Sequence, residues 1–409
     1  PDQYPELSPG VLVRGKGSHV WDVDGNEYIE YGMGLRSVTL GHAYPDVNQA
    51  VRAAIGDGTN FTRPSLLELE LAEVFSSLVE GAEMVKFTKD GSTATTAALK
   101  LARKATGRDL VGICADSPFF SYDDWFMCTT TADGGIPADV RAQTVSFDFN
   151  DLASVERMFA EHPAAIAAVF VEASRTAPPE PGFLRGLRDL CDAHGAVLVF
   201  DEMITGFRYG FPGAQTLYGV RPHLSTWGKA VANGFALSIL SGDRDLMRLG
   251  SRARESDDVF LLSTTHGAES VGLAAGLATI EVFRREPVVD HLARQGRALS
   301  DGLAELAARH GLAEHVMPVG VPCNLMFATL DPDGRPSQSY RTLFLQETIR
   351  RGVLTPSLVD TYAHIDQDIA DTLDAIDGAL EIYSRALEDG VDGFLVGPPS
   401  RYVFDRKWG

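Results

Sequence analysis

Continuous apolar stretches separated by helical patterns dominate the middle of the chain. Four stretches have the length and composition of buried strands: Met84–Phe87, Leu110–Ile113, Ala167–Val171 and Ala196–Phe200. Strands that are apolar at every position are covered on both faces, which is typical of a mostly parallel sheet between two layers of helices. We therefore predict an α/β core from about Ser65 to Arg285.

The two ends of the chain follow a different pattern, in which strand and helix signals are mixed. In chain order these signals are strand-like Gly10–Val13 and Ser18–Asp22, helical Leu292–His310, strand-like Asn324–Phe327 and helical Asp366–Ala386. Because no linker separates the ends from the middle, we expect intertwined domains. The predicted organisation is an N-terminal segment 1–54 of a smaller α+β domain, a large domain 55–286 and a C-terminal part 287–409 of the small domain.

The acidic composition argues against nucleic acid and anionic membranes as binding partners. The 56 acidic and 36 basic side chains give a formal net charge of −20, and a surface of this sign repels nucleic acid and anionic membranes. No apolar run is long enough to span a bilayer and the start has no signal-peptide pattern, so we expect a cytoplasmic protein. The chain begins at Pro1, so we expect processing or excision, and membership of a larger fusion is open.

The four cysteines do not form a metal-binding pattern. The cysteines are widely scattered, at Cys114, Cys128, Cys191 and Cys323. This spacing favours reduced thiols over a metal site or a disulfide framework. We expect no metal.

An acid and a lysine follow predicted strands, where an open parallel sheet places its ligands. Asp201 comes directly after Phe200, and Lys229 follows the strand-like Ser225–Trp227 and Gly228, 28 positions later. Each has an ordinary alternative, a helix cap for the acid and a solvated side chain for the lysine. Together they match the needs of pyridoxal phosphate (PLP), whose aldehyde condenses with a lysine and whose ring nitrogen is held protonated by an aspartate.

A third feature lies between the strand at Met84–Phe87 and a helix predicted from about Thr93 to Thr106. The sequence Asp90-Gly91-Ser92-Thr93 offers backbone amides and hydroxyls at a helix N-terminus, which is a suitable place for a phosphate. A simple Ser/Thr helix cap is the alternative interpretation. The phosphate interpretation depends on the lysine and the aspartate.

Six stretches, taken in order, resemble the class III aminotransferases of fold type I, and within them the glutamate-1-semialdehyde 2,1-aminomutase branch. They are Trp21–Tyr28, Leu40–Pro45, Gly91–Thr95, Leu101–Arg108, Phe200–Arg208 and Gly228-Lys229. The resemblance covers almost the whole chain. It implies a mostly parallel seven-stranded sheet in a large PLP-binding domain, and a homodimer with its active site at the subunit interface.

The resemblance also implies roles for the strand-end residues. Lys229 corresponds to the lysine that binds PLP covalently and moves the substrate's proton, and Asp201 corresponds to the partner of the ring nitrogen. Glu172 occupies the position of a glutamate that lines the cofactor pocket, with an exposed strand-end acid as the alternative.

Phosphate binding is implied for Gly91, Ser92 and Thr93, helped by a threonine of the neighbouring subunit. Thr265 is the first candidate for that threonine and Thr264 the second.

The chain differs from the family pattern in two segments that the resemblance places at the substrate. An aromatic-His-Gly segment is replaced by Phe119–Trp125, in which Phe119 still offers a ring to stack on the cofactor and Phe120 stands where the histidine is expected. We predict substrate contacts for Phe120 and Tyr122. A further departure places Arg36 in the substrate segment, where it either clamps a carboxylate or phosphate or forms an ordinary surface ion pair.

These observations predict a PLP-dependent aminotransferase that moves an amino group from an amino-acid donor to a small, specialised aldehyde or ketone. An aminomutase that transfers the amine within one substrate is the alternative. Decarboxylation and a non-enzymatic binding role are left open, although the pair Lys229 and Asp201 argues against the latter.

Overall fold

The structure is a computed structural model that describes residues 4–116, 119–174, 176–251, 259, 262 and 265–401. The chain forms two compact units. The larger unit runs from Asp46 to Arg284, and the smaller unit contains the described residues up to Pro45 and from Arg285 onward.

A seven-stranded sheet forms the centre of the larger unit, in the order β4-β10-β9-β8-β7-β5-β6. The strands are β4 (Met84–Thr88), β5 (Leu110–Cys114), β6 (Thr144–Phe147), β7 (Ile166–Val171), β8 (Val197–Asp201), β9 (Leu224–Trp227) and β10 (Ser238–Gly242). Only β10 among them runs antiparallel to its neighbours, β4 and β9. The predicted mostly parallel seven-stranded sheet is therefore confirmed.

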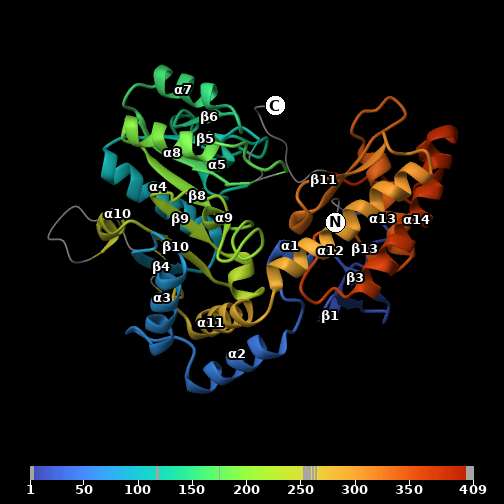
Figure 1. Cartoon of the computed structure of the whole chain (residues 1–409), viewed down its shortest axis with the longest axis horizontal. Helices are drawn as coiled ribbons and strands as arrows, with labels where there is room; N and C mark the ends of the chain where they lie inside the picture. The colour runs from blue at the N-terminus through green and yellow to red at the C-terminus, as the bar shows by residue number, and fades with distance from the viewer. Residues whose placement is uncertain are drawn as a thin grey trace. The chain divides into compact units, whose positions relative to one another are not determined.

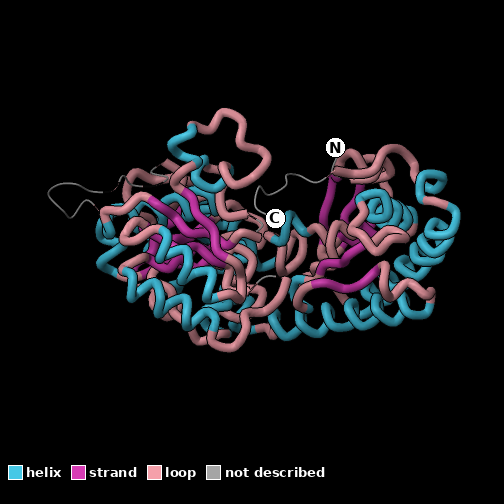
Figure 2. Tube along the Cα trace, turned by 90° about the horizontal axis from the view of Figure 1, so that it is seen from above, coloured by secondary structure: helices cyan, strands magenta, loops and turns pink. Residues whose placement is uncertain are grey.

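Helices cover both faces of this sheet, as apolar strands require. Helices α7 (Leu152–Glu161) and α8 (Phe183–His194) pack on one face against alternate strand residues such as Val169. Helix α4 (Gly91–Thr106) packs on the other face, against residues such as Phe170. Figure 1 shows α4, α7 and α8 beside the strands, and Figure 2 shows the strands of this unit running side by side between helices.

The remaining helices of the larger unit connect the strands or follow the sheet. They are α2 (Pro45–Asp57), α3 (Leu66–Leu78), α5 (Asp124–Met127), α6 (Ala138–Arg141), α9 (Ala214–Leu217), α10 (Arg244–Met247) and α11 (Ser270–Arg285), with short 3₁₀ helices η1 (Lys229–Ala232) and η2 (Arg248–Gly250). In the described part of the chain, no helix is both long and apolar enough to cross a membrane.

The smaller unit is built from both ends of the chain. Its strands are β1 (Leu12–Lys16), β2 (His19–Asp22), β3 (Glu27–Glu30) and β13 (Val353–Leu354) in one sheet and β11 (Val316–Val319) with β12 (Met326–Thr329) in another. Its helices are α1 (Met33–Arg36), α12 (Val288–Arg309), α13 (Gln338–Arg350) and α14 (Asp366–Asp389), with η3 (Pro322–Asn324) and η4 (Val391–Phe394). The parallel pair β3 and β13 joins the two ends.

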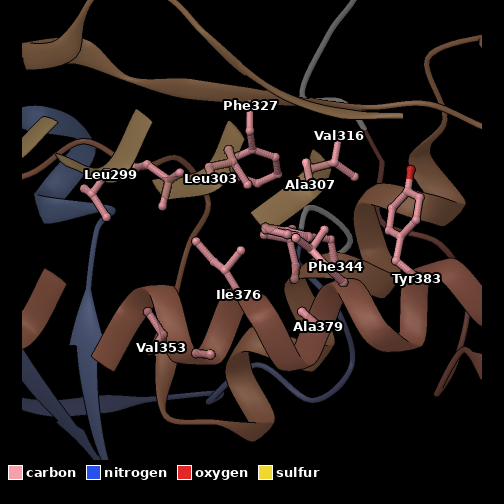
Figure 3. Packing of buried hydrophobic residues seen from close by; sticks show 14 of the residues in the cluster. Leu299, Leu303, Ala307, Val316, Phe327, Phe344, Val353, Ile376, Ala379 and Tyr383 are labelled. Carbon is pink, nitrogen blue, oxygen red and sulfur yellow. The ribbon is translucent and has the colours of Figure 1, made fainter. Parts of the chain in front are cut away.

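Three helices and the β11–β12 hairpin enclose the core of the smaller unit. Figure 3 shows Leu303 of α12, Phe327 of β12, Phe344 of α13 and Ile376 of α14 packed together. The rings of Phe327 and Phe344 lie 4.7 Å apart between centroids. Tyr383 is fully buried, and its hydroxyl donates to the Leu330 carbonyl at 2.6 Å, which satisfies its polar end.

One predicted strand is shifted by the local backbone. The strand expected at Asn324–Phe327 begins only at Met326, because Pro322–Asn324 forms the 3₁₀ turn η3. Proline favours the start of a helical turn and donates no backbone hydrogen bond to a sheet.

Candidate active site

Three neighbouring parallel strands deliver the predicted residues to one edge of the sheet. The register pairs Val171 of β7 with Phe200 of β8, and Asp201 of β8 with Thr226 of β9. Glu172 and Asp201 therefore emerge side by side. The next strand, β9, ends at Trp227, and Lys229 follows it two residues later.

Asp201 is almost completely buried, with 1% of its surface exposed. Its Oδ1 accepts a hydrogen bond from the Met203 amide at 2.9 Å and one from Thr226 Oγ1 at 3.3 Å. Both donors contact Oδ1, and among the described residues none donates to Oδ2. The carboxylate thus has one oxygen available for a further donor.

The charges around Asp201 make its ionisation depend on its neighbours. Burial raises the pKa of Asp201 from 3.8 to about 8, and the nearby Glu172 carboxylate adds to the rise. The Lys229 ammonium acts in the opposite direction. Glu172 itself is 4% exposed, so the alternative of an exposed strand-end acid is wrong. The edge of the sheet therefore holds two buried acids and one lysine that interact electrostatically.

Lys229 lies at a backbone position that the preceding glycine makes possible. It is half-buried and starts η1 with a φ of 46°, which is uncommon for a residue with a side chain. A Cβ on Gly228 would come within 2.6 Å of Met203 Sδ and 2.7 Å of Ser238 Oγ. A side chain at position 228 would therefore displace the segment that carries the lysine.

Met203 links this segment to the start of α4. A Cβ on Gly91 would lie 2.9 Å from Met203 Sδ, so the thioether packs against both glycines. An unbranched, flexible methionine suits such an irregular gap. Nothing in the sequence pattern singled out this residue.

The second acid of the motif has a structural task. Glu202 is buried, and its carboxylate accepts hydrogen bonds from the amides of Ala214 at 3.0 Å and Gln215 at 2.7 Å, and from the Thr205 hydroxyl. It therefore holds the loop that leads from β8 to α9. Asp201, by contrast, faces Glu172 and Lys229.

The predicted phosphate loop forms the first turn of α4. Helix geometry leaves the amides of Gly91, Ser92 and Thr93 without intrahelical partners. Asp90 caps the helix: its Oδ1 accepts from the Thr93 amide at 2.8 Å and its Oδ2 from the Thr93 hydroxyl at 2.9 Å. The donors of Thr93 are therefore already used, whereas those of Gly91 and Ser92 are not used by the cap.

Hydrogen bonds attach the aromatic segment Phe119–Trp125 to the same helix. The Tyr122 amide donates to Ser92 Oγ at 3.0 Å, and Thr95 Oγ1 donates to the Phe120 carbonyl at 2.8 Å. Among the described residues the Ser92 hydroxyl accepts this one bond and donates none. Its hydrogen is thus available to a ligand at the start of α4.

A second group of bonds holds the far end of the segment through Thr96. The Trp125 indole donates to Thr96 Oγ1 at 2.8 Å, and Thr96 Oγ1 donates to the Asp123 carboxylate. Ser121 Oγ accepts from the Asp123 amide at 3.0 Å. The sequence reasoning missed Thr95 and Thr96, because a hydroxyl inside a helix has no pattern that reveals a distant partner.

The aromatic residues of this segment differ in exposure. Phe119 is 42% exposed and Tyr122 is 60% exposed, so both present surface to solvent. Phe120 is 2% exposed and packs in the core, with its ring 5.7 Å from that of Phe126 and 6.1 Å from that of Phe170. The substrate contact predicted for Phe120 is therefore not supported by its position.

The remaining predicted residues are Thr265, Thr264 and Arg36. Thr265 is exposed, and its carbonyl accepts from Asn60 Nδ2 at 2.7 Å. Thr264 lies outside the described residues. Arg36 belongs to the smaller unit, where its Nε donates to Asn324 Oδ1 at 2.7 Å.

Comparison with known proteins places these features in a family. The family described as Aminotransferase class-III matches residues 4–380. The glutamate-1-semialdehyde 2,1-aminomutase of Nitrosospira multiformis is 37% identical over 338 residues, which cover 80% of this chain and 78% of that protein.

Solved structures agree with the family match. The PLP internal aldimine form of the FumI protein from Sphingopyxis sp. MTA144 has a TM-score of 0.87 and 29% identity, covering 96% of this chain and 93% of that one. An omega-transaminase from Sphaerobacter thermophilus has a TM-score of 0.82 and 26% identity, covering 94% and 93%. The predicted fold type I architecture and PLP cofactor are confirmed. This chain belongs to the class III aminotransferases, which are PLP-dependent enzymes.

Proposed function

We propose that this aminotransferase moves an amino group from an amino-acid donor to a specialised aldehyde or ketone, with Lys229 and Asp201 as its catalytic residues. The observation that carries the proposal is the strand-end arrangement of Asp201, Glu172 and Lys229. A buried carboxylate whose Oδ2 accepts from no described donor is suited to the N–H of a pyridinium ring.

The residues at the sheet edge fit the cofactor. When bound, PLP supplies an aldehyde that condenses with amines and a ring that accepts electrons. We assign Lys229 Nζ to the covalent attachment of the cofactor and to proton transfer at the substrate's α-carbon. Asp201 holds the proton on the ring nitrogen, because a positive partner stabilises its buried negative charge. Glu172 lines the pocket next to Asp201.

The phosphate contacts are proposed for the start of α4. Gly91 and Ser92 offer their amides, and Ser92 adds its hydroxyl hydrogen. Thr93 contributes less than the sequence suggested, because Asp90 already accepts from its amide and its hydroxyl. In a homodimer, the partner subunit would add one threonine to the phosphate ligands. Thr265 is our first candidate for this threonine, and Thr264 is the alternative.

Contacts to the ring and to the substrate are proposed for Phe119, Tyr122 and Arg36. Phe119 offers an exposed ring to stack on the cofactor, and Tyr122 offers an exposed phenol to the substrate. Arg36 is the candidate for binding a substrate carboxylate or phosphate, since a guanidinium binds two oxygens at once.

A donor half-reaction tests the proposal. The PLP-loaded protein is mixed with L-glutamate or L-alanine in the absence of an acceptor, and the keto acid is measured together with the loss of the visible absorbance of the lysine-bound cofactor. One keto acid per active site is the expected result. No conversion with any common amino acid would reject intermolecular transfer.

The aminomutase alternative is favoured by one observation, the 37% identity with the aminomutase of Nitrosospira multiformis. Its test is incubation of the protein with glutamate 1-semialdehyde alone. Isomerisation without a separate donor would support this alternative, whereas a requirement for an added amino acid would support the aminotransferase.

A further inference from the structure

The residue that caps α4 is an acid, Asp90, and it lies next to the position proposed for the phosphate. Asp90 is partly buried, and both of its carboxylate oxygens contact Thr93, at 2.8 Å to the amide and 2.9 Å to the hydroxyl. An ionised aspartate accepts hydrogen bonds and donates none. It therefore keeps the donors of Thr93 from a phosphate, and its negative charge lies at the same positive end of the helix dipole.

The lysine next to Asp90 does not compensate for this charge. Lys89 Nζ lies 2.6 Å from Glu269 Oε1 and donates to the Ala236 carbonyl at 2.8 Å. Burial acts to raise the pKa of Glu269, but the bonds from Lys89 and from the Gly272 and Val271 amides lower it overall. Glu269 is thus ionised near neutral pH, and its charge is opposite to that of Lys89.

We propose that Asp90 weakens the binding of phosphate oxygens at the start of α4, and so makes the phosphorylated cofactor easier to release. The inference rests on the proposed function, because it takes Gly91 and Ser92 as the phosphate ligands. The repulsion between a carboxylate and a phosphate at adjacent helix positions is partly screened by solvent, since Asp90 is not fully buried. Asp90 is therefore a residue that sets cofactor affinity, and it is not required for the reaction itself.

The isosteric change Asp90→Asn separates charge from capping. Asparagine caps helices as well as aspartate does, so α4 keeps its first turn while the charge is removed. The full chain is freed of cofactor, and its affinity is measured by equilibrium dialysis for pyridoxamine 5′-phosphate and for pyridoxamine, which has no phosphate. Neither ligand depends on attachment to Lys229.

We expect the D90N protein to bind pyridoxamine 5′-phosphate about tenfold more tightly than the unaltered chain, with a smaller gain at high salt. Its affinity for pyridoxamine is expected to be unchanged. The matched control is Asp151→Asn, which changes the cap of α7, where Asp151 Oδ1 accepts from the Ser154 amide at 3.2 Å. Helix α7 follows β6, at the opposite margin of the sheet from β4. The control is expected to leave both affinities unchanged.

Three outcomes would overturn the inference: equal or weaker binding of the phosphorylated ligand by D90N, an equal gain for both ligands, or the same gain in D151N. If D90N fails to fold, Asp90→Ser replaces it, because serine also caps the helix and carries no charge. Failure of the proposed function would be seen differently, as absence of a covalent bond between PLP and Lys229 in the unaltered chain.

Discussion

At the scale of single residues, the proposed chemistry depends on the environment of Asp201. This carboxylate is buried beside Glu172, and within the described residues it accepts from two donors, both at Oδ1. In the protein without cofactor, burial and Glu172 oppose its ionisation. We expect a cationic ring nitrogen beside Asp201 to favour the ionised carboxylate and so to lower its pKa.

A pH dependence of stability follows from the pKa of Asp201, which burial raises from 3.8 to about 8. The folded state binds more protons than the unfolded state between these values, so this group's contribution to stability is present below pH 3.8 and is lost as the pH rises to about 8. We predict that the cofactor-free protein loses stability relative to Asp201→Asn from pH 5 toward pH 8, as measured by urea unfolding. A constant difference between the two proteins over this range would contradict the prediction.

Gly228 allows a second residue-scale prediction. A Cβ at this position would lie 2.6 Å from Met203 Sδ, so Gly228→Ala must shift the segment that begins at Lys229. We predict that G228A lowers the affinity for PLP by about tenfold or more, since such overpacking costs about 1–3 kcal/mol. Fluorescence titration of the cofactor-free protein measures this change. Gly134→Ala is the control, because no atom lies within 4 Å of its added Cβ; equal effects of the two variants would show that the clash does not matter.

At the scale of elements, α4 holds the aromatic segment in place. Its residues Ser92, Thr95 and Thr96 each hydrogen-bond to the segment Phe119–Trp125. The helix thus carries the proposed phosphate contacts at its first turn and also holds the aromatic segment beside it. The segment that contains Phe119 is consequently held by side chains of a helix.

Removal of the Thr96 hydroxyl tests this support. In Thr96→Val, the Trp125 indole and the Asp123 carboxylate lose their shared partner, so we predict a loss of about 1–2 kcal/mol in the free energy of unfolding. Thr96→Ser is expected to restore most of it. Thr106→Val is the control on the same helix, since Thr106 Oγ1 donates to the Ala102 carbonyl at 2.8 Å and accepts from the Arg108 amide at 3.3 Å, and neither partner belongs to the aromatic segment. Equal losses in T96V and T106V, measured by denaturant unfolding, would contradict the prediction.

Sequence patterns identified the apolar strands because those strands are buried on both faces. They did not identify β10, whose serines lie inside the sheet: Ser241 Oγ lies 3.0 Å from Ser225 Oγ and accepts from the Trp227 indole at 3.1 Å. These polar groups satisfy one another through tertiary contacts that no local pattern reveals. The strand-end residues Asp201 and Lys229 were predictable for the opposite reason, since position after a strand is local information.

At the scale of the whole molecule, the larger unit contains Lys229, Asp201, Glu172 and the start of α4, and the smaller unit contains Arg36. The residues assigned to the cofactor and the residue assigned to a substrate anion therefore belong to different units. For a substrate that carries a carboxylate, we expect variants of Arg36 to raise the KM of that substrate, while the cofactor stays bound.

The burial of Phe120 could not be predicted from the sequence. It depends on ring contacts with Phe126 of α5 and Phe170 of β7, which are tertiary contacts.

The covalent attachment site of PLP shows directly whether Lys229 binds the cofactor. The PLP-loaded chain is reduced with borohydride, which fixes a lysine-bound cofactor, then digested and analysed by mass spectrometry. The account predicts one label per chain on the peptide that contains Lys229, and none in Lys229→Ala. A label on another lysine, or unchanged labelling in K229A, would contradict it.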